Sequence, residues 1–417
     1  MPTAIRCSIL SAAQYCREDH GLANEGCRKT MDKINQKSYC IFSANYYPYL
    51  GGVETFTRNL AAALIDAGNS VTVVTNNTKQ CPQHEITPEG IEIFRLPCCP
   101  LMNGRMPLPK KDGIYKEMMG EIHARKWDGV LVNTRFYFHS LEGLKTAEKA
   151  GLKPLVCEHG SAYLSLNNAF LDLLIKIWEH LVTARVKSYH PSFCAVSKKS
   201  AEWLHTFGAP CEGILSNSID AAAFRGAASG RDFRHELGLS DADFVICFIG
   251  RYVPEKGIPK LLDAMKELED LPITLLMAGA GPLKEQIGAC GLASVHDLGR
   301  LESADVAALM IQSNLMCLPT RSEGFCTSLL EASACSLPSL ITPVGGTDEL
   351  IPSEEYGNLL PKDCSAADIA NAMRRLFGSP DLLMEQGKNA NRLVLTEYSW
   401  KKTAARYVEL NDRIQNM

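Results

Sequence analysis

Two glutamates, Glu323 and Glu331, stand in the run PTRSEGFCTSLLE and are separated by seven residues. The apolar run at 313–318 predicts a buried strand before them, and the run at 328–334 predicts a helix with Ser or Thr as its cap. Glu323 then lies in the loop and Glu331 in the first helical turn. In open α/β sheets ligands bind beyond the carboxyl ends of the strands, where free N–H groups at a helix start attract anions and hydroxyl oxygens. The pattern therefore predicts two carboxylates at one binding crevice.

Each of these glutamates also has a purely structural interpretation. Ser328 and Glu331 have the spacing of a capping box, in which Glu331 would only satisfy its own helix terminus. Glu323 precedes a glycine in a turn, where a solvated carboxylate is common. This segment by itself leaves both alternatives open.

A pair of cations, Arg251 and Lys256, follows a strand predicted at 246–250 and precedes an amphipathic helix predicted at 258–268. Fixed cations lower a barrier when they are aimed at negative charge that grows in the reaction. Arg can fork onto two oxygens, and Lys acts as a point charge. The alternative is a solvated loop, since exposure is the default for both residue types.

Polar groups also follow two strands of the first half. Gly51 and Gly52 lie between a strand predicted at 39–44 and a helix predicted at 54–67, so the backbone there can approach an anion closely. An ordinary tight turn explains the same glycines. His159 comes directly after a strand predicted at 154–157, a place from which it can meet a ligand, although a lone loop histidine is more often a turn or core residue.

The elements that must position these residues alternate along the chain. Besides the strands above, short apolar runs predict strands at 71–75 and 129–133, a strand with a Gly-rich turn is predicted at 273–281, and a helix is predicted at 303–313. Strands that alternate with helices are typical of α/β folds with doubly wound sheets. The sequence therefore predicts parallel sheets whose carboxyl ends carry the candidate residues.

Taken together, the motifs resemble the retaining glycosyltransferases of the family 4 type, also called group 1. The run EGFCTSLLEA resembles the E-x7-E signature of that family, and Arg251 and Lys256 match its R-x4-K pair. The run GAGP at 279–282 looks like its strand-GxGP element. Cys326 and Ser218 stand where the family usually has glycine, which could re-shape the sugar pocket and one turn. The ordered motifs cover nearly all of the chain after residue 38.

The resemblance implies an α/β fold of the GT-B architecture, with two Rossmann-like domains facing across a cleft. It implies a retaining, hexosyltransferase-type enzyme that moves a sugar from a UDP- or GDP-sugar to an acceptor hydroxyl. The product would belong to a cell-surface polysaccharide or a glycolipid. The nucleotide-sugar is a co-substrate, and neither a cofactor nor a metal is expected. The acceptor would be a glycan or a lipid-linked molecule.

Residue roles follow from the same resemblance. The second domain would place Glu331 on the ribose hydroxyls, and the main chain near Leu301 on the base. Arg251 and Lys256 would hold the diphosphate. Glu323 and the turn that follows it would hold the transferred sugar, while the first domain would bring His159 and its GG loop over the donor. The catalytic set implied is His159, Arg251, Lys256 and Glu323, and the donor-binding set is Gly51, Gly52, Arg251, Lys256, Leu301, Glu323, Phe325, Cys326, Thr327 and Glu331.

Two other classes of function remain open. A sugar-nucleotide epimerase or hydrolase of the same fold would consume donor without an acceptor. A non-catalytic protein that binds glycans or nucleotide-sugars would be expected to lose Arg251, Lys256 or Glu323, which this chain retains. Asp241 and Asp243 have the D-x-D form of a metal motif, but turn or capping roles are expected for them.

Composition excludes some classes of protein but does not identify the class of this one. The 417 residues, 46% of them hydrophobic, can form two domains of ordinary size, and a net charge of −4 gives no sign of a nucleic-acid partner. The sixteen cysteines lie largely in apolar runs and predict reduced, buried thiols of a cytoplasmic protein. No apolar segment approaches the length of a transmembrane helix.

The domain organisation predicted is a polar, disordered leader at 1–37, an N-terminal acceptor domain at 38–215 and a C-terminal donor domain at 216–397. The last helix, within 398–417, is expected to pack back onto the first domain. Basic residues at 105–126 and an apolar helix at 168–187 raise the prospect of peripheral contact with the inner face of a membrane. Packing of that helix in the core is the favoured interpretation, since an amphipathic stripe usually faces its own core.

Overall fold

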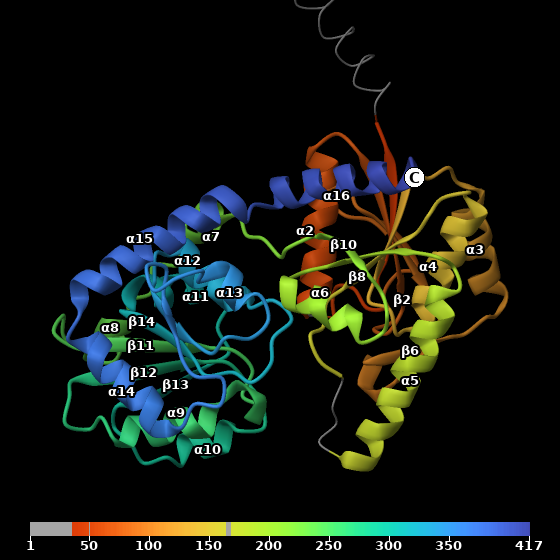
Figure 1. The fold of residues 1–417 in the computed structure, drawn as a ribbon. Coiled ribbons are helices and arrows are strands. Elements are labelled where there is room, and N and C mark those ends of the chain that lie inside the picture. Colours follow the sequence, from red (N-terminus) through yellow and green to blue (C-terminus); the bar gives the residue numbers. More distant parts are fainter. Residues whose placement is uncertain (1–35, 50, 164–167) are drawn as a thin grey trace, which may run out of the picture.

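The computed structural model describes residues 36–49, 51–163 and 168–417, which form two α/β units, each with its own sheet (Figure 1). The leader predicted at 1–37 lies almost wholly outside the described residues. The predicted α/β fold with two Rossmann-like units is confirmed.

The first unit is built on a sheet of eight strands in the order β10-β9-β8-β7-β1-β2-β4-β3. All neighbours are parallel except β3, which runs antiparallel to β4. The strands are β1 (Ser38–Phe42), β2 (Ser70–Asn76), β3 (His84–Ile86), β4 (Glu92–Leu96), β7 (Gly129–Asn133), β8 (Leu155–Glu158), β9 (Ser192–Ala195) and β10 (Cys211–Ile214).

Helices and one small hairpin surround this first sheet. The helices are α2 (Gly52–Asp66), α3 (Gly113–Ala124), α4 (Phe138–Lys149), α5 (Ala169–Lys187) and α6 (Lys198–His205). The antiparallel hairpin joins β5 (Cys98–Leu101) to β6 (Met106–Pro109) through the short 3-10 helix η1 (Met102–Gly104). In Figure 1 this hairpin lies beside α5 at the outer edge of the unit.

The second unit has a fully parallel sheet in the order β13-β12-β11-β14-β15-β16. Its strands are β11 (Phe244–Ile249), β12 (Ile273–Ala278), β13 (Val295–Gly299), β14 (Leu315–Leu318), β15 (Ser339–Ile341) and β16 (Asn358–Leu359). Its helices are α7 (Ala221–Gly226), α8 (Phe233–Glu236), η2 (Pro254–Lys256), α9 (Ile258–Lys266), α10 (Lys284–Gly288), α11 (Ser303–Gln312), α12 (Thr327–Ala334), α13 (Thr347–Leu350), α14 (Ala366–Phe377) and α15 (Pro380–Glu397).

The strands form where the sequence is apolar on both faces. β7 and β12 are buried at every residue, as expected for parallel strands that helices cover on both sides. The boundary predicted for β7 is confirmed, and those of the other strands that carry the site differ by one or two residues. Such shifts are ordinary at element ends.

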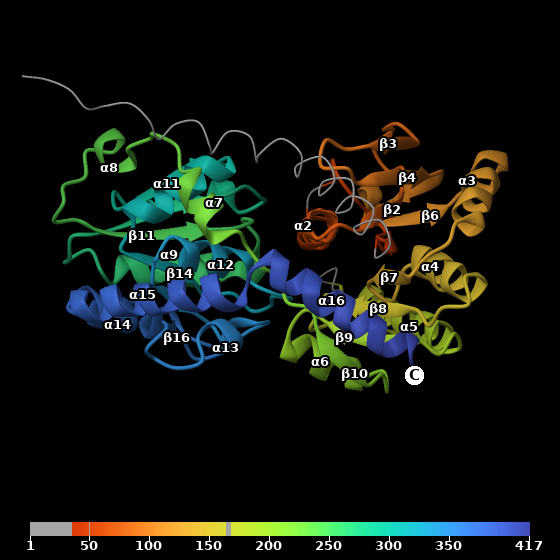
Figure 2. The same cartoon turned by 90° about the horizontal axis from the view of Figure 1, so that it is seen from above.

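The chain finally crosses from the second unit to the first. The helix α16 (Trp400–Gln415) continues from α15 and lies along the first unit in both views (Figures 1 and 2). Asn411 of α16 donates a hydrogen bond of 2.9 Å to the carbonyl oxygen of Asp128, and the rings of Tyr407 and Tyr39 meet edge to face. Ser218, unusual at its position, lies 2.8 Å from the Thr403 hydroxyl through its own oxygen, so it helps to fix α16.

Candidate active site

The loop that carries Arg251 and Lys256 packs directly against the loop that carries Glu323. The carbonyl oxygen of Glu255 accepts a hydrogen bond of 2.8 Å from the N–H of Arg321. Gly257 has a φ of +74°, and a Cβ atom on it would lie 2.1 Å from the carbonyl oxygen of Pro319. Only glycine fits such a position, because both the backbone conformation and the space exclude a side chain. The two motifs are thus one structural body.

Within this body Lys256 and Glu323 form an ion pair, whose side chains are 13% and 14% exposed. Water screens such a partly buried pair less than it screens a surface pair. Arg251 is exposed and has no hydrogen-bond or ion-pair partner recorded among the described residues. The site therefore contains a lysine whose charge Glu323 balances and an arginine that is accessible to an anionic ligand.

The glycine-rich turn after β12 packs against the loop that carries Arg251. A Cβ atom on Gly279 would lie 1.9 Å from the carbonyl oxygen of Gly250, and one on Gly281 would lie 2.5 Å from that of Tyr252. Tyr252 is fully buried, and its hydroxyl donates 2.8 Å to Asp297. These glycines therefore allow close packing of two loops. Leu301, predicted near the base, lies between β13 and α11 and packs partly buried against the core.

The turn after Glu323 touches the first unit. A Cβ atom on Gly324 would lie 2.1 Å from the carbonyl oxygen of His159. The Ser161 hydroxyl donates 2.7 Å to the carbonyl oxygen of Glu323, and the Ser197 hydroxyl donates 3.2 Å to that of Gly324. Residues of both units therefore meet at one point.

Gly324→Ala is expected to lower kcat/KM on the order of 10²-fold, the loss associated with a displacement of about 1 Å at a reacting centre. The added methyl group must push the turn away from His159, while most of the core stays unchanged. Steady-state kinetics of sugar transfer would measure the effect. Gly288→Ala is the matched control, since a Cβ atom there meets nothing within 4 Å. Equal activity of the two variants would contradict this role for the contact.

The side chain of His159 is held in place on two sides. Its Nε2 atom lies 2.9 Å from Oδ1 of Asn133, whose amide donates 2.7 Å to the Thr57 hydroxyl. The imidazole also meets the Phe56 ring edge to face at 4.8 Å between ring centroids. His159 is therefore a positioned residue at the meeting point of the units, and Asn133 could have been suspected from its place at the end of β7.

The backbone at His159 rests on a buried cluster of charges. Oε1 of Glu158 accepts hydrogen bonds from the N–H groups of His159 and Gly160, at 3.1 and 2.8 Å. Arg135 donates to Glu158 at 2.8 Å and to Glu179 of α5 at 2.7 Å, and all three side chains are at most 3% exposed. The sequence analysis did not identify Arg135, because no local pattern marks a buried arginine.

The glycine turn at the start of α2 already holds a carboxylate of the chain itself. Gly51 caps the helix, and a Cβ atom on it would lie 2.4 Å from Oε2 of Glu54. Burial raises the pKa of Glu54, while a backbone hydrogen bond and the nearby His159 oppose that increase. Gly52 is exposed. A donor phosphate at this helix start would therefore have to displace Glu54 or meet its protonated form.

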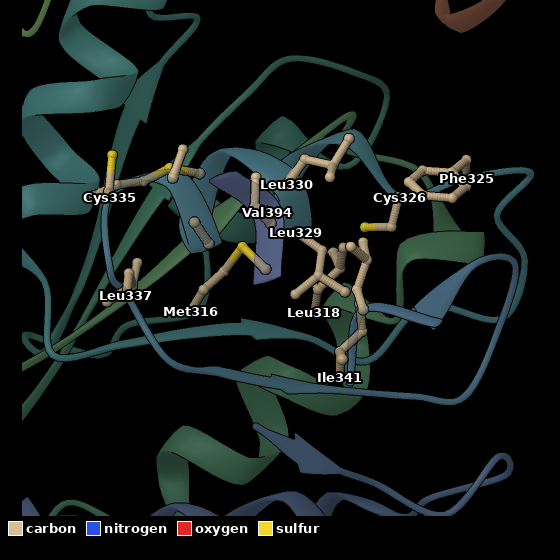
Figure 3. Packing of buried hydrophobic residues seen from close by; sticks show 14 of the residues in the cluster. Met316, Leu318, Phe325, Cys326, Leu329, Leu330, Cys335, Leu337, Ile341 and Val394 are labelled. Carbon is tan, nitrogen blue, oxygen red and sulfur yellow. The ribbon is translucent and has the colours of Figure 1, made fainter. Parts of the chain in front are cut away.

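The turn predicted to hold the sugar divides into buried and exposed parts. Phe325 and Cys326 are buried and lie at one end of the apolar cluster that includes Leu318 and Leu329 (Figure 3). Cys326 caps α12 with a φ of −76°, so this position does not need glycine, and burial raises the pKa of its thiol to about 12. Thr327 is exposed. Of these three residues only Thr327 is therefore exposed to a ligand.

The predicted Ser or Thr cap of α12 was wrong, because the helix starts at Thr327 after Cys326, with no side-chain cap bond. Glu331 consequently lies in the second turn, and the capping-box alternative is not realised. Glu331 and Thr327 line a cavity of about 880 Å³ between α2, α7, α12 and the start of α16. His159, Arg251, Lys256 and Glu323 do not line this cavity. The structure thus places the predicted residues in two neighbouring groups.

Burial raises the pKa of Glu331 to about 7. In the unfolded chain the pKa of this carboxyl is the ordinary value of 4.5, so the folded state binds the proton more tightly. The carboxyl therefore favours folding at low pH, and this contribution is lost as the pH rises through about 7. Relative to Glu331→Gln, wild-type stability should fall by up to about 3 kcal/mol between these pH values. Urea unfolding at several pH values measures this. Glu302→Gln, an exposed carboxyl, is the control, and an equal slope in both variants would refute the assignment.

The D-x-D run has a structural role. Asp243 accepts hydrogen bonds from the N–H and the hydroxyl of Ser240, at 2.6 and 2.8 Å, and so closes a turn before β11. Across the described ranges, no group of three or more His, Cys, Asp or Glu side chains is arranged to hold a metal ion.

Comparison with known proteins agrees with this geometry. Residues 50–220 match the family model described as Glycosyltransferase Family 4, and residues 230–393 match that of Glycosyl transferases group 1. A glycosyltransferase of Methanocaldococcus jannaschii is 31% identical over 379 residues, which cover 88% of this chain and 97% of that protein. One component of the human phosphatidylinositol N-acetylglucosaminyltransferase is 23% identical, over 90% of this chain and 76% of its own length.

The fold comparison leads to the same family. Anabaena HepE, solved in complex with UDP-glucose, has a TM-score of 0.68 at 18% identity and covers 91% of this chain and 100% of its own. The motifs, their meeting point between two Rossmann-like units and the sequence matches converge. The chain therefore belongs to the family 4, group 1 glycosyltransferases and has their GT-B fold.

Proposed function

We propose that the protein is a retaining glycosyltransferase that moves a sugar from a nucleotide diphosphate donor to an acceptor hydroxyl. The observation that carries this proposal is the turn at Glu323 and Gly324, which pairs with Lys256 on one side and contacts His159 of the other unit. Such a junction can hold a donor sugar between a cation-bearing loop and an acceptor-facing residue.

The roles of the residues follow their environments. Arg251 is free to bind the diphosphate, and Lys256 would exchange part of its contact with Glu323 for a phosphate oxygen. Both cations oppose the negative charge that grows on the leaving nucleotide. Glu323 and the exposed Thr327 would then contact the sugar hydroxyls, and Glu331 would accept hydrogen bonds from the ribose in its cavity.

The proposed chemistry needs no protein base. The bond between the anomeric carbon and the leaving phosphate oxygen breaks, and the acceptor oxygen bonds to the same face of the sugar. The acceptor proton passes to the leaving phosphate, so atoms and charge balance. In support, Glu323 is engaged with Lys256 and the Nε2 atom of His159 with Asn133. The two cations take the place of a metal ion in this proposal.

A glycan or a lipid-linked molecule is the acceptor class we propose, in the synthesis of a cell-surface polysaccharide or glycolipid. The human relative carries a phosphatidylinositol lipid in its name, which favours the lipid-linked class. A cytoplasmic location with access to a membrane belongs to the same proposal.

The first test is a thermal-shift panel of UDP, GDP and their sugar conjugates on wild type, Arg251→Ala and Arg392→Ala, whose arginine is an exposed residue of α15. A ligand that binds only the folded state raises its stability, by about 2.7 kcal/mol at 100 times the dissociation constant. UDP-sugars come first because HepE binds UDP-glucose. Stabilisation by one nucleotide that is lost only in Arg251→Ala supports the donor site, and no shift with any nucleotide overturns it.

Product analysis separates the remaining alternatives. Transfer that depends on the acceptor and keeps the anomeric configuration, read by NMR of the product, supports the proposal. Donor consumption without any acceptor would instead indicate a hydrolase or epimerase. Binding without turnover across a broad acceptor panel would indicate a binding protein.

A further inference from the structure

The apolar helix α5 does not bury its apolar face. Five large side chains of its first four turns are 46% to 68% exposed: Phe170, Leu173, Leu174, Ile177 and Leu181. The favoured expectation that this helix face packs in the core was therefore wrong. The opposite side carries the contacts to the domain, such as Glu179 with Arg135. We call these five residues the α5 stripe.

The members of the α5 stripe lie on one side of the helix. Steps of three and four residues place side chains on a common face of an α-helix. The stripe extends from Phe170 to Leu181, which corresponds to about 16 Å along the axis at 1.5 Å per residue. Monomeric proteins seldom expose a continuous apolar surface of this kind unless it binds something.

A second apolar feature lies against the same helix. The hairpin of β5 and β6 and helix α5 enclose a groove of about 440 Å³. Its lining includes Leu101, Met102, Met106, Leu108, Phe138 and Trp178. Leu101 and Met102, at the hairpin tip, are themselves 49% and 46% exposed. The groove and the α5 stripe share Leu174, so they form one continuous apolar surface.

Cations border this surface on a chain that is acidic overall. Arg105 lies in the hairpin, and Lys176 and Arg185 lie on α5, all of them exposed. The chain as a whole carries a net charge of −4. An apolar stripe on a helix, bordered by lysine and arginine, is the arrangement that binds in the plane of an anionic lipid surface.

We propose that the α5 stripe and the hairpin groove dock the N-terminal unit onto a membrane that contains anionic lipids. Apolar side chains would enter the region between headgroups and acyl chains while the cations meet the phosphates. The helix would lie on the membrane, and within the described part of the chain no helix is long and apolar enough to cross one. A second copy of the chain is the alternative occupant, but the cations on this face would then repel their symmetry mates.

The position of the surface connects it with the proposed site. Glu179 of α5 binds Arg135, which binds Glu158, which holds the backbone of His159. A lipid surface beside α5 would therefore lie on the unit that is proposed to bind the acceptor. The docking inference goes beyond the proposed function and does not need a nucleotide, so the two can fail separately.

Flotation of the full chain with vesicles tests the inference, using phosphatidylcholine alone or mixed with phosphatidylglycerol. We expect binding to the anionic vesicles and little to the neutral ones. Ile177→Glu with Leu181→Glu should weaken that binding by about 10- to 100-fold, since each substitution removes one apolar contact and adds a repelled charge. Met384→Glu on α15 is the matched control, because Met384 is 56% exposed but lies far along the chain in the other unit.

Several outcomes would overturn the inference. One is the absence of binding to both kinds of vesicle, and another is binding of the double variant that equals that of the wild type. The third is a dimer of the wild type, detected by light scattering, that the control variant forms and the double variant does not. The substituted residues are exposed, so folding should be retained. The thermal shift that a nucleotide causes in the double variant, measured without lipid, checks that the variant is folded. The same measurement tests the donor site independently of the membrane.

Discussion

Lys256→Ala is expected to lower kcat/KM by about 10²- to 10³-fold, the usual loss when one group that stabilises the charge of a transition state is removed. The variant also leaves the carboxylate of Glu323 partly buried without its cation. That carboxylate would then repel the diphosphate that Lys256 is proposed to attract. Initial rates over a range of donor concentrations give kcat and KM separately.

The control for this loss is Lys266→Ala. Lys266 lies on α9, the helix that follows Lys256, and it pairs with Asp263 at the surface. An exposed pair of this kind contributes little to stability, so the control should retain both its fold and its activity. The double variant Lys256→Ala with Glu323→Gln should regain donor binding but not the full rate. If Lys256→Ala behaves like the control, the assignment of Lys256 to the diphosphate is wrong.

Arg135→Met is expected to lower the free energy of unfolding by about 3–5 kcal/mol, the cost of breaking a buried ion pair from one side. The change removes the cation from Glu158 and Glu179, both almost fully buried. The backbone at His159 should shift as well, because Glu158 accepts hydrogen bonds from the N–H groups of His159 and Gly160. Urea unfolding monitored by circular dichroism measures the loss of stability.

A triple variant separates charge from packing in this cluster. Arg135→Met combined with Glu158→Gln and Glu179→Gln leaves no buried charge among the three positions and should recover much of the lost stability. Transfer activity should stay reduced, since a neutral amide holds the N–H groups of the His159 loop less strongly than a carboxylate does. Full stability of the single Arg135→Met variant would contradict the proposed role of the ion pairs.

Local sequence patterns were enough to predict the fold of this protein. Runs such as GVLVN and ITLLMA can satisfy their backbones and bury both faces only as parallel strands under helices. The order of motifs placed Arg251, Lys256 and Glu323 beyond the carboxyl ends of two strands, and in the structure they follow β11 and β14. The substitution at Cys326 proved harmless to the backbone, because its φ does not require glycine.

Two expectations, the cap of α12 and the burial of α5, were wrong, and the contact of Glu54 with Gly51 was not foreseen. The helix at Glu331 starts one residue early, because the buried Cys326 takes the cap position. Glu54 covers the start of α2, and its approach to Gly51 depends on a burial that composition does not reveal. The stripe of α5 has the same periodicity as a core helix, and periodicity alone does not state whether a face meets protein or solvent.

The sequence by itself determined the two α/β units, the family and the identity of most candidate residues, because these depend on residue types at fixed spacing. Only the tertiary structure decided which of them meet. It joined Gly324 to His159, placed Arg135 under that contact, paired Lys256 with Glu323 and put Glu331 at a cavity beside α2 and α7. Such contacts link residues that lie far apart in the sequence, and their energies depend on burial and distance, which exist only once the chain has folded.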